Sequence, residues 1–406
     1  MRDALLEGMA LASVLRDFLA DSAPERVAPP LLRAHFEGRS VPDRVLCLGK
    51  AAPGLAAAAR AVWPYVPGLL YGVPGRPAPP GFLDLRGDHP EPTPGNVRRT
   101  REVRDWLREG RGGLLALVSG GTSALLVAPR PPWTLREKAG LAARLLASGA
   151  PIRDVNAVRL ALSEVKGGGL LKDLGGWSCA TGIWSDVGPG QARLVGSGPT
   201  LPWRPAVSAG QVLRALGISA PRGLPAPSPA ARRPRDRWFL LADGLFLRRL
   251  AADSLRARGL RVREVPVREG EGADVLAARL VSLAVAARGG GGPPRAWVGV
   301  GEATVDVGNH RGAGGRCSHL AAALALLLRE AAPSARWSLT VLATDGMDGS
   351  GDGGAFTDDR HVPNPSALKE ALARRETASL WRREGTFIPR GPAGNNLRDL
   401  WVLVVG

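Results

Sequence analysis

Residues 114–126 read Leu-Leu-Ala-Leu-Val-Ser-Gly-Gly-Thr-Ser-Ala-Leu-Leu, and this stretch decides the fold class. Its first five residues are apolar, as is typical of a fully buried strand. A polar turn with two glycines follows at 119–123, and an apolar, helix-like segment begins at Ala124. A strand, a glycine turn and a helix in this order predict one unit of an α/β layer with parallel strands.

The same order recurs along the chain and predicts two domains. A stretch at 218–236 is rich in proline, arginine and alanine without a hydrophobic period, which favours a linker or a long surface loop. We therefore expect two α/β domains with largely parallel sheets, a Rossmann-like domain over 1–217 and a second over 237–406. The predicted strands are 44–48, 69–73, 114–118, 178–184, 238–242, 261–267, 295–300 and 338–343, and the predicted helices are 3–20, 51–62, 97–108, 134–148, 152–174, 245–258, 273–287 and 316–330.

Composition indicates an ordinary soluble globular protein. Hydrophobic residues make up 45% and charged residues 22% of the 406 positions, and no stretch has the roughly 18 uncharged apolar residues of a membrane span. Acidic Asp3 and Glu7 interrupt the first apolar stretch, which argues against a signal peptide. The three cysteines are far apart and fit no metal spacing, so we expect free thiols in a reducing cytoplasm.

The formal net charge of +17 raises the possibility of a nucleic-acid partner. Only five of the 54 basic residues are lysines, and the arginines are spread over the whole chain, which favours a dispersed solvated surface instead. Where arginine is the usual base, a lysine that remains suggests a need for a compact ammonium group. Lys50 and Lys166 both lie inside glycine-containing segments.

Polar segments follow the predicted strands at the ends where α/β proteins bind ligands. Lys50 is placed to neutralise a phosphate, while Asp186 and Asp345 are candidate Mg²⁺ ligands or a base for a hydroxyl. The segment 301–316 ends in Arg316 at the start of a helix, a layout that suits an anion. Tight turns and helix caps are the alternative interpretation of each segment. A phosphate cradle is expected from the backbone and hydroxyl groups of Ser119, Gly120, Gly121, Thr122 and Ser123.

An ordered series of short segments resembles the glycerate 2-kinase family with a C-terminal MOFRL domain, whose members are also called hydroxypyruvate reductases. The series covers nearly the whole chain and is weakest between about 205 and 290. Its segments are Leu48-Gly-Lys-Ala-Ala52, Asp88-His-Pro-Glu-Pro92, Val118-Ser-Gly-Gly-Thr-Ser-Ala-Leu-Leu126, the stretches 148–159 and 162–168, Ser185-Asp-Val187, Gly196-Ser-Gly-Pro-Thr200, 301–316, Thr344-Asp-Gly-Met-Asp-Gly349 and 391–400.

The resemblance implies a cytoplasmic enzyme of carbohydrate metabolism with its active site in a cleft between two α/β domains, the MOFRL region covering 295–406. The implied reaction is ATP- and Mg²⁺-dependent phosphorylation of the 2-hydroxyl of D-glycerate, giving 2-phosphoglycerate. The resemblance implies that Lys50 and Arg316 are central to catalysis. From the residue types themselves, we also expect Asp186 to be catalytic and Lys166 to bind ATP. We expect no nucleic-acid or membrane partner, and a monomer or a homodimer.

This sequence departs from the family at five places, which leaves the substrate open. One is Gly394-Asn-Asn-Leu-Arg-Asp399, where the family has Gly-Thr-Asn-Val-Asn-Asp. Thr122 stands at a usual glycine, Gly169 at an arginine, Gly188-Pro-Gly190 at a segment with an acid, and Cys317-Ser-His319 at three other polar residues. The alternatives are a kinase for another small hydroxy acid, a catalytically impaired relative, or a nucleotide-dependent oxidoreductase. The oxidoreductase is disfavoured because the chain has no convincing dinucleotide fingerprint.

Overall fold

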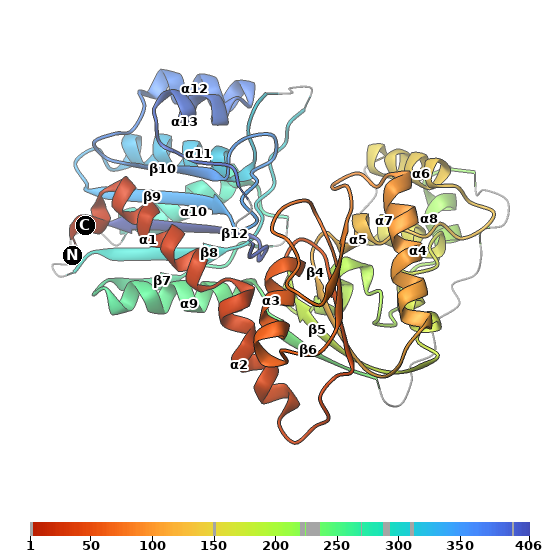
Figure 1. Ribbon diagram of the computed structural model, residues 1–406. Coiled ribbons are helices and arrows are strands. Elements are labelled where there is room, and N and C mark those ends of the chain that lie inside the picture. The colour runs from red at the N-terminus through yellow and green to blue at the C-terminus, as the bar shows by residue number, and fades with distance from the viewer. Residues whose placement is uncertain are drawn as a thin grey trace. The chain divides into compact units, whose positions relative to one another are not determined.

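The computed structural model describes residues 3–148, 152–219, 224, 236–268, 270–286, 293–308, 312–391 and 394–406 (Figure 1). The chain divides into two compact units, one formed by 27–241 and the other by 1–26 together with 242–406. These bounds differ from the expected 1–217 and 237–406, because the N-terminal helix belongs with the C-terminal part of the chain. Most of the predicted linker at 218–236 lies outside the described residues.

The first unit contains a six-stranded sheet in the order β3-β2-β1-β4-β5-β6. Each pairing from β3 through β5 is parallel, which confirms the expected α/β layer. The strands are β1 (Arg44–Leu48), β2 (Gly68–Gly72), β3 (Phe82–Arg86), β4 (Arg111–Ser119), β5 (Gly176–Trp184) and β6 (Arg237–Ala242). The helices of this unit are α2 (Pro24–Phe36), α3 (Ala52–Val62), α4 (Pro94–Arg108), α5 (Thr122–Leu125), α6 (Leu135–Ala147), α7 (Ile152–Ala161) and α8 (Ala209–Ala215), with short 3-10 helices at Gly169–Asp173 and Ala192–Ser197.

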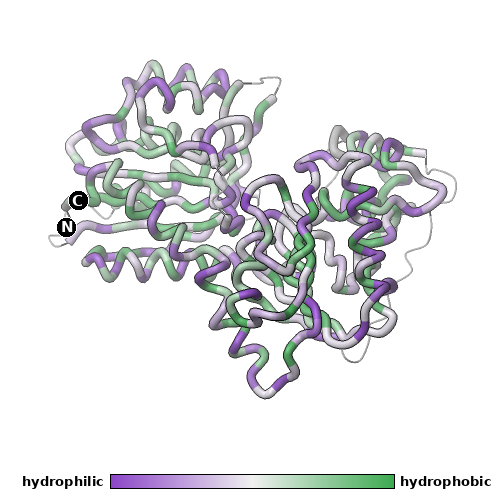
Figure 2. The backbone as a smooth tube through the Cα atoms, in the orientation of Figure 1, coloured by the Kyte–Doolittle hydropathy of each residue, from purple (hydrophilic) through white to green (hydrophobic). Residues whose placement is uncertain are grey.

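The register of this sheet brings its carboxyl-end loops together. Leu48 is paired with Val118 and with Tyr71, and Val118 is paired with Ile183. Because these residues are the last or nearly the last of their strands, the turns after β1, β4 and β5 lie at one edge. In the central strands β1 and β4, residues 45–48 and 114–118 are apolar and buried, as expected for strands covered on both faces. Figure 2 shows the hydropathy of each residue along the backbone.

The predicted helix at 152–174 is wrong in its second half. Helix α7 ends at Ala161, and the chain then passes through turns into a 3-10 helix at Gly169–Asp173. Gly167 and Gly168 both have positive φ, a conformation that the right-handed helix excludes. The apolar residues on either side of this bend had the spacing of one long helix.

The second unit contains another six-stranded sheet, in the order β11-β10-β9-β12-β8-β7. Only β7 and β8 are parallel; the other pairings are antiparallel, so the expectation of a largely parallel sheet is wrong for this unit. The strands are β7 (Arg261–Glu264), β8 (Arg295–Val300), β9 (Trp337–Ala343), β10 (Gly354–Asp358), β11 (Phe387–Ile388) and β12 (Asp399–Val405). Its helices are a 3-10 helix at Asp3–Leu6, α1 (Gly8–Asp21), α9 (Gly244–Ala257), α10 (Ala273–Ala286), α11 (Arg316–Ala331), α12 (Pro365–Arg374) and α13 (Thr377–Arg383).

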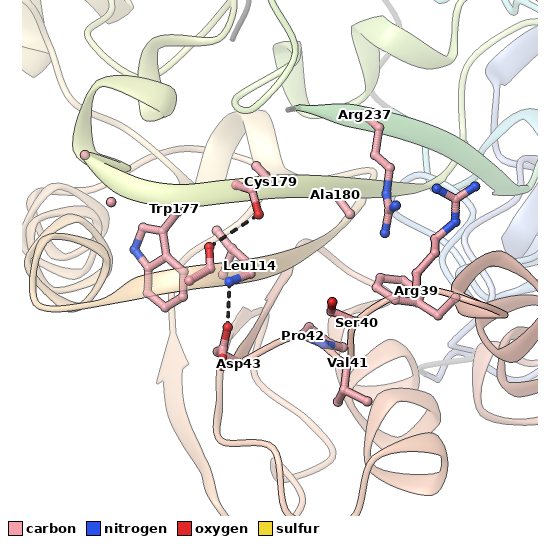
Figure 3. A pocket seen from close by; sticks show the side chains of 16 residues that line it. Arg39, Ser40, Val41, Pro42, Asp43, Leu114, Trp177, Cys179, Ala180 and Arg237 are labelled. Carbon is pink, nitrogen blue, oxygen red and sulfur yellow. Dashed lines mark hydrogen bonds between the residues drawn. The ribbon is translucent and has the colours of Figure 1, made fainter. Parts of the chain in front are cut away.

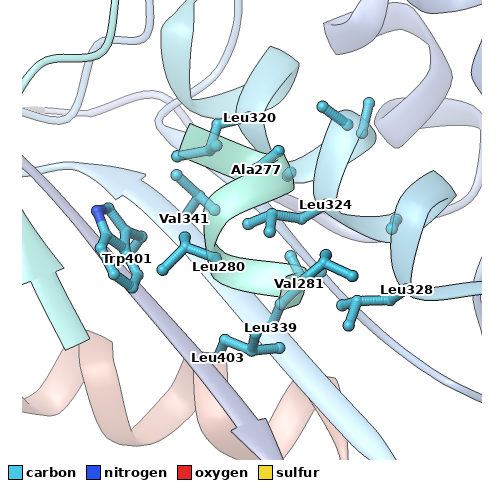
Figure 4. Packing of buried hydrophobic residues seen from close by; sticks show 14 of the residues in the cluster. Ala277, Leu280, Val281, Leu320, Leu324, Leu328, Leu339, Val341, Trp401 and Leu403 are labelled. Carbon is cyan, nitrogen blue, oxygen red and sulfur yellow. The ribbon is translucent and has the colours of Figure 1, made fainter. Parts of the chain in front are cut away.

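Helices cover both faces of this second sheet. Side chains alternate along β9, so Leu339 and Val341 pack with α10 and α11 in the core, as Figure 4 shows. The neighbouring Ser338 points the other way, and its Oγ donates a hydrogen bond to Leu5 O. On the same side, Gly8 N donates to the carboxylate of Asp358 at 2.8 Å. The N-terminal segment therefore packs on strands β9 and β10, which lie more than 300 positions away in the sequence.

Candidate active site

The turn after β1 and the turn after β4 are tied together at the carboxyl edge of the first sheet. Lys50 N donates to Gly120 O at 2.8 Å, and Ala51 N donates to Ser119 Oγ at 3.1 Å. Ser119 Oγ in turn donates to Leu48 O at 2.9 Å. The Ser119 hydroxyl is thus fully buried and holds the backbone in place, while Lys50 is half-buried beside it.

Of the five residues of the expected phosphate cradle, some line a cavity and the others are interior residues of the turn. Gly121 has a φ of +83°, and a Cβ there would come within 2.8 Å of Lys50 Cγ, so this glycine lets the lysine stem pass. Thr122 is buried and its hydroxyl donates to Ser119 O at 2.7 Å. Gly121 and Ser123 line a cavity, whereas Ser119, Gly120 and Thr122 do not border it. Thr122, the residue at a usual glycine, therefore fills an interior position.

Lys166 contacts the turn 119–123 through its ammonium group. Its Nζ donates to Ser123 O at 2.9 Å, to Ser123 Oγ, and to Ser197 Oγ at 3.3 Å. Burial, together with the nearby charges of Lys138 and Arg159, holds the pKa of Lys166 well below its usual range. All three cations line the same cavity. Of these residues, only Lys166 was expected at the site. Lys138 was signalled only by the rarity of lysine, and Arg159 only by its place in the 148–159 segment of the family series.

Asp186 lies at the same edge of the first sheet. It follows the end of β5 at Trp184 and is half-buried. The turns that contain Lys50, residues 119–123 and Asp186 are therefore assembled by one sheet. Asp345 and Arg316 follow strands of the second sheet, so the polar segments that the sequence placed on one edge belong to two sheets.

In the second unit, the chain itself supplies an anion to the N-terminus of α11. The carboxylate of Asp348 accepts hydrogen bonds from Cys317 N and Ser318 N, both at 2.8 Å. A Cβ on Gly315 would lie 2.1 Å from Asp348 Oδ1, so the glycine is needed for the carboxylate to reach the helix. The glycine-rich pattern at 301–316 does predict an anion, but the anion found there is an aspartate side chain. His310 and Arg311 of this segment lie outside the described residues.

Arg316 is held by two carboxylates. Its Nε donates to Asp399 Oδ2 at 3.0 Å, its Nη2 donates to Asp399 Oδ1 at 3.4 Å, and its Nη1 donates to Glu302 Oε2 at 3.1 Å. Burial of Asp399 raises the pKa of its carboxyl to about 7, against the opposing effect of Arg316. Arg316 is 42% exposed, and these contacts use three of the five N–H groups of a guanidinium.

Asp345 stabilises its own turn, because its Oδ1 accepts a hydrogen bond from Met347 N at 3.0 Å. Within the described residues, no group of three or more His, Cys, Asp and Glu side chains is placed to hold a metal ion. Asp186 and Asp345 belong to different units, so their shared binding of Mg²⁺ stays a prediction.

The departures at 317–319 have structural roles. Ser318 Oγ accepts from Thr377 Oγ1 at 3.0 Å, and His319 Nε2 lies 3.0 Å from Asp274 Oδ1. Burial lowers the pKa of His319. Cys317 is buried, as are the other two cysteines, and all three are free, as the sequence predicted.

A hollow of about 770 Å³ lies at the opposite, amino-terminal edge of the first sheet (Figure 3). Arg39 and Arg237 border it, and Asp43 accepts a hydrogen bond from Gly113 N at 2.6 Å. Parallel α/β sheets bind ligands at the carboxyl edge, and none of the candidate residues lies at this hollow.

The fold defines the class as a two-unit α/β protein, with basic side chains beside the carboxyl-edge loops of its first sheet. Residues 10–224 match the DUF4147 family, described as a domain of unknown function, and residues 295–399 match the MOFRL family. The chain belongs to this DUF4147 and MOFRL family, which confirms the family resemblance seen in the sequence. The described residues include no helix that is long and apolar enough to cross a membrane.

Several proteins of this kind are similar to the chain. A putative hydroxypyruvate reductase of Agrobacterium vitis is 29% identical over 385 residues, covering 89% of this chain and 87% of that protein. A human glycerate kinase is 48% identical over 88 residues, covering 22% of this chain and 17% of that protein. The crystal structure of a glycerate kinase from Thermotoga maritima has the same fold, with a TM-score of 0.83 at 23% identity, covering 98% of this chain and 100% of that one.

Proposed function

We propose that this protein is a glycerate 2-kinase, which transfers a phosphoryl group from ATP to the 2-hydroxyl of D-glycerate. The observation that carries the proposal is the set of basic groups at the carboxyl edge of the first sheet. Lys50 lies against Gly121, and Lys166 lies against Ser123 of the same loop. Phosphoryl transfer requires mainly positioning and cations that stabilise the moving charge, and this edge supplies both. Relatives that carry the name glycerate kinase support the choice of acceptor.

Each candidate side chain has a distinct role in this proposal. Lys50 stabilises the transferring phosphoryl group as a compact charge, and Asp186 orients the attacking hydroxyl. Arg316 uses its remaining N–H groups on the glycerate carboxylate or on a phosphate, with Asp399 and Glu302 fixing the plane of its guanidinium. Because Lys50 and Arg316 belong to different units, the proposed reaction would need both units.

The residues present are compatible with Mg²⁺ delivered together with ATP. Mg²⁺ is usually held by one or two carboxylates and by the phosphates of the nucleotide, without a cage made of protein groups alone. Asp186 and Asp345 are the proposed carboxylates, and the ion would neutralise charge on the phosphates.

The experiment is an assay of the purified protein with ATP, Mg²⁺ and a panel of hydroxy acids that includes D-glycerate and L-glycerate. We expect ADP formation that depends on D-glycerate. The product should be a direct substrate of enolase without added mutase, because enolase acts on 2-phosphoglycerate. A product that requires the mutase would place the phosphate on the 3-hydroxyl. If the protein oxidises NADH or NADPH with hydroxypyruvate and forms no ADP, the kinase proposal is rejected and a reductase function is supported.

A further inference from the structure

A cavity of about 670 Å³ in the first unit gathers three cations that the expected site did not include as a group. It lies between α6, α7 and the loop after β4. Lys138 is only 8% exposed, and its Nζ has no hydrogen-bond partner among the described residues. Lys166 is 6% exposed and donates to neutral oxygens alone. Arg159 of α7 lines the same cavity.

This arrangement is unfavourable without a ligand. A buried ammonium that lacks a counter-charge loses its hydration and gains nothing in return. Lys138 and Arg159 also repel each other, and burial with this repulsion lowers the pKa of Lys138 to about 8. No salt bridge joins Lys138, Arg159 or Lys166 to a carboxylate within the described part of the chain. An anion with several charged oxygens would relieve all three groups at once.

The rest of the lining identifies the kind of anion. One wall is apolar and is formed by α6, with Val127 and two prolines completing it. The volume lies in the range of pockets that take ligands of drug size, about 300–1,000 Å³, and is large for a three-carbon acid. The carboxylate at the border, Glu91, is exposed. The apolar side chains that α6 contributes to this wall are Leu135, Ala139, Ala142 and Ala143.

We propose that this cavity is the ATP site, in which Lys138, Arg159 and Lys166 contact the phosphates and the alanine face of α6 packs against the adenine ring. The inference rests on the proposed kinase function for its role in catalysis, although the binding itself can be measured alone. Gly121 and Ser123 border the phosphates in this assignment, so the loop after β4 contributes two of its five expected residues. Lys138 and Arg159 become binding residues that the sequence analysis did not single out.

The experiment compares nucleotide binding by Lys138→Met and Lys172→Met in the full chain, measured by calorimetry with ATP, inorganic triphosphate and adenosine. Methionine keeps much of the lysine stem without its charge, and Lys172 is an exposed lysine of the same unit that serves as the control. We expect Lys138→Met to weaken the binding of ATP and of triphosphate by about tenfold or more, because charged hydrogen bonds to the phosphates are lost. Adenosine should bind both variants equally, and Lys172→Met should bind all three ligands like the wild type.

The melting temperature of Lys138→Met shows whether a loss of binding arises from unfolding. Loss of an unpaired buried charge should leave the melting temperature of Lys138→Met unchanged or higher, so weak binding cannot be ascribed to unfolding. Wild-type affinity of Lys138→Met for ATP would overturn the assignment. If Lys138→Met raises the KM for glycerate and leaves the KM for ATP unchanged, the assignment is also overturned. In that case the cavity binds glycerate, and the proposed kinase function still stands. Weakened ATP binding in a protein without any kinase activity would support the cavity and reject the proposed function.

Discussion

Replacement of Asp348 by alanine tests whether α11 depends on an internal anion. The carboxylate is 3% exposed and accepts two backbone hydrogen bonds of 2.8 Å from the first turn of a 16-residue helix. Its removal leaves two buried N–H groups unsatisfied, at about 1–3 kcal/mol each, and removes a favourable charge from the helix N-terminus, worth roughly 0.3–1 kcal/mol. Water that enters the vacated space offsets part of this loss. We therefore expect a loss of about 2–4 kcal/mol in the free energy of unfolding.

Scanning calorimetry of the full chain measures this effect. A loss of that size lowers the transition of the second unit by about 4–16 °C for a domain of roughly 150–250 residues. Asp348→Asn keeps one acceptor oxygen and should lose about half as much. Asp253→Asn is the control, because Asp253 is 70% exposed in its pair with Arg256 and should change stability by less than about 0.5 kcal/mol. If Asp348→Ala melts together with this control, the carboxylate does not stabilise the helix and the site is open to an external anion.

Three further predictions concern the basic residues. Lys50→Ala should lower kcat by several orders of magnitude with a nearly unchanged melting temperature, and wild-type turnover in a coupled assay would refute the role of Lys50. Arg316→Lys should reduce kcat/KM nearly as much as Arg316→Ala, because an ammonium cannot replace the planar fork held by Asp399; if the lysine variant keeps most of the wild-type value, Arg316 is a scaffold residue. The pKa of Lys138 is lowered to about 8, so the folded state binds fewer protons than the unfolded state above that pH, and urea unfolding should show stability rising between pH 8 and about 10.5. Lys166 and Arg159 face the same cavity, so Lys138→Met should reduce this slope without removing it, and an unchanged slope would contradict the assignment of the shift.

The parallel layer of the first unit could be predicted from sequence because β1 and β4 contain continuous apolar runs followed by glycine turns. Strand β3, Phe-Leu-Asp-Leu-Arg, lacks this pattern and was missed. Residues 114–118 were placed correctly within β4, although the strand begins earlier, at Arg111. The second sheet could not be oriented in the same way. Strand β9 is buried along its whole length, so it has the pattern of a parallel strand, but it pairs antiparallel with β10 and β12. Periodicity reports burial, and burial on both faces does not determine strand direction.

The candidate site was predictable where a residue type signals both chemistry and position. Rare lysines in glycine segments identified Lys50 and Lys166, which do lie against one loop. Asp348 was missed although it belongs to the quoted segment 344–349, because capping requires a partner 31 positions away in sequence. Asp399 was missed as the partner of Arg316 for the same reason, since the two are 83 positions apart. Spacing along a chain describes local structure, whereas the Asp348 helix cap and the Arg316–Asp399 ion pair form only when distant segments come together.

The discontinuous second unit also has a consequence for folding during synthesis. Residues 27–241 form a complete unit and can fold while the rest of the chain is still being made. Helix α1, however, buries Leu11 and Leu15, and the strands it contacts, β9 and β10, are among the last third of the chain to be synthesised. Its apolar face must therefore remain uncovered throughout most of translation, open to chaperones or to premature contacts with other chains. Amino-acid changes on this face should show their first effect as a lower yield of folded protein, before any change in the properties of the protein that does fold.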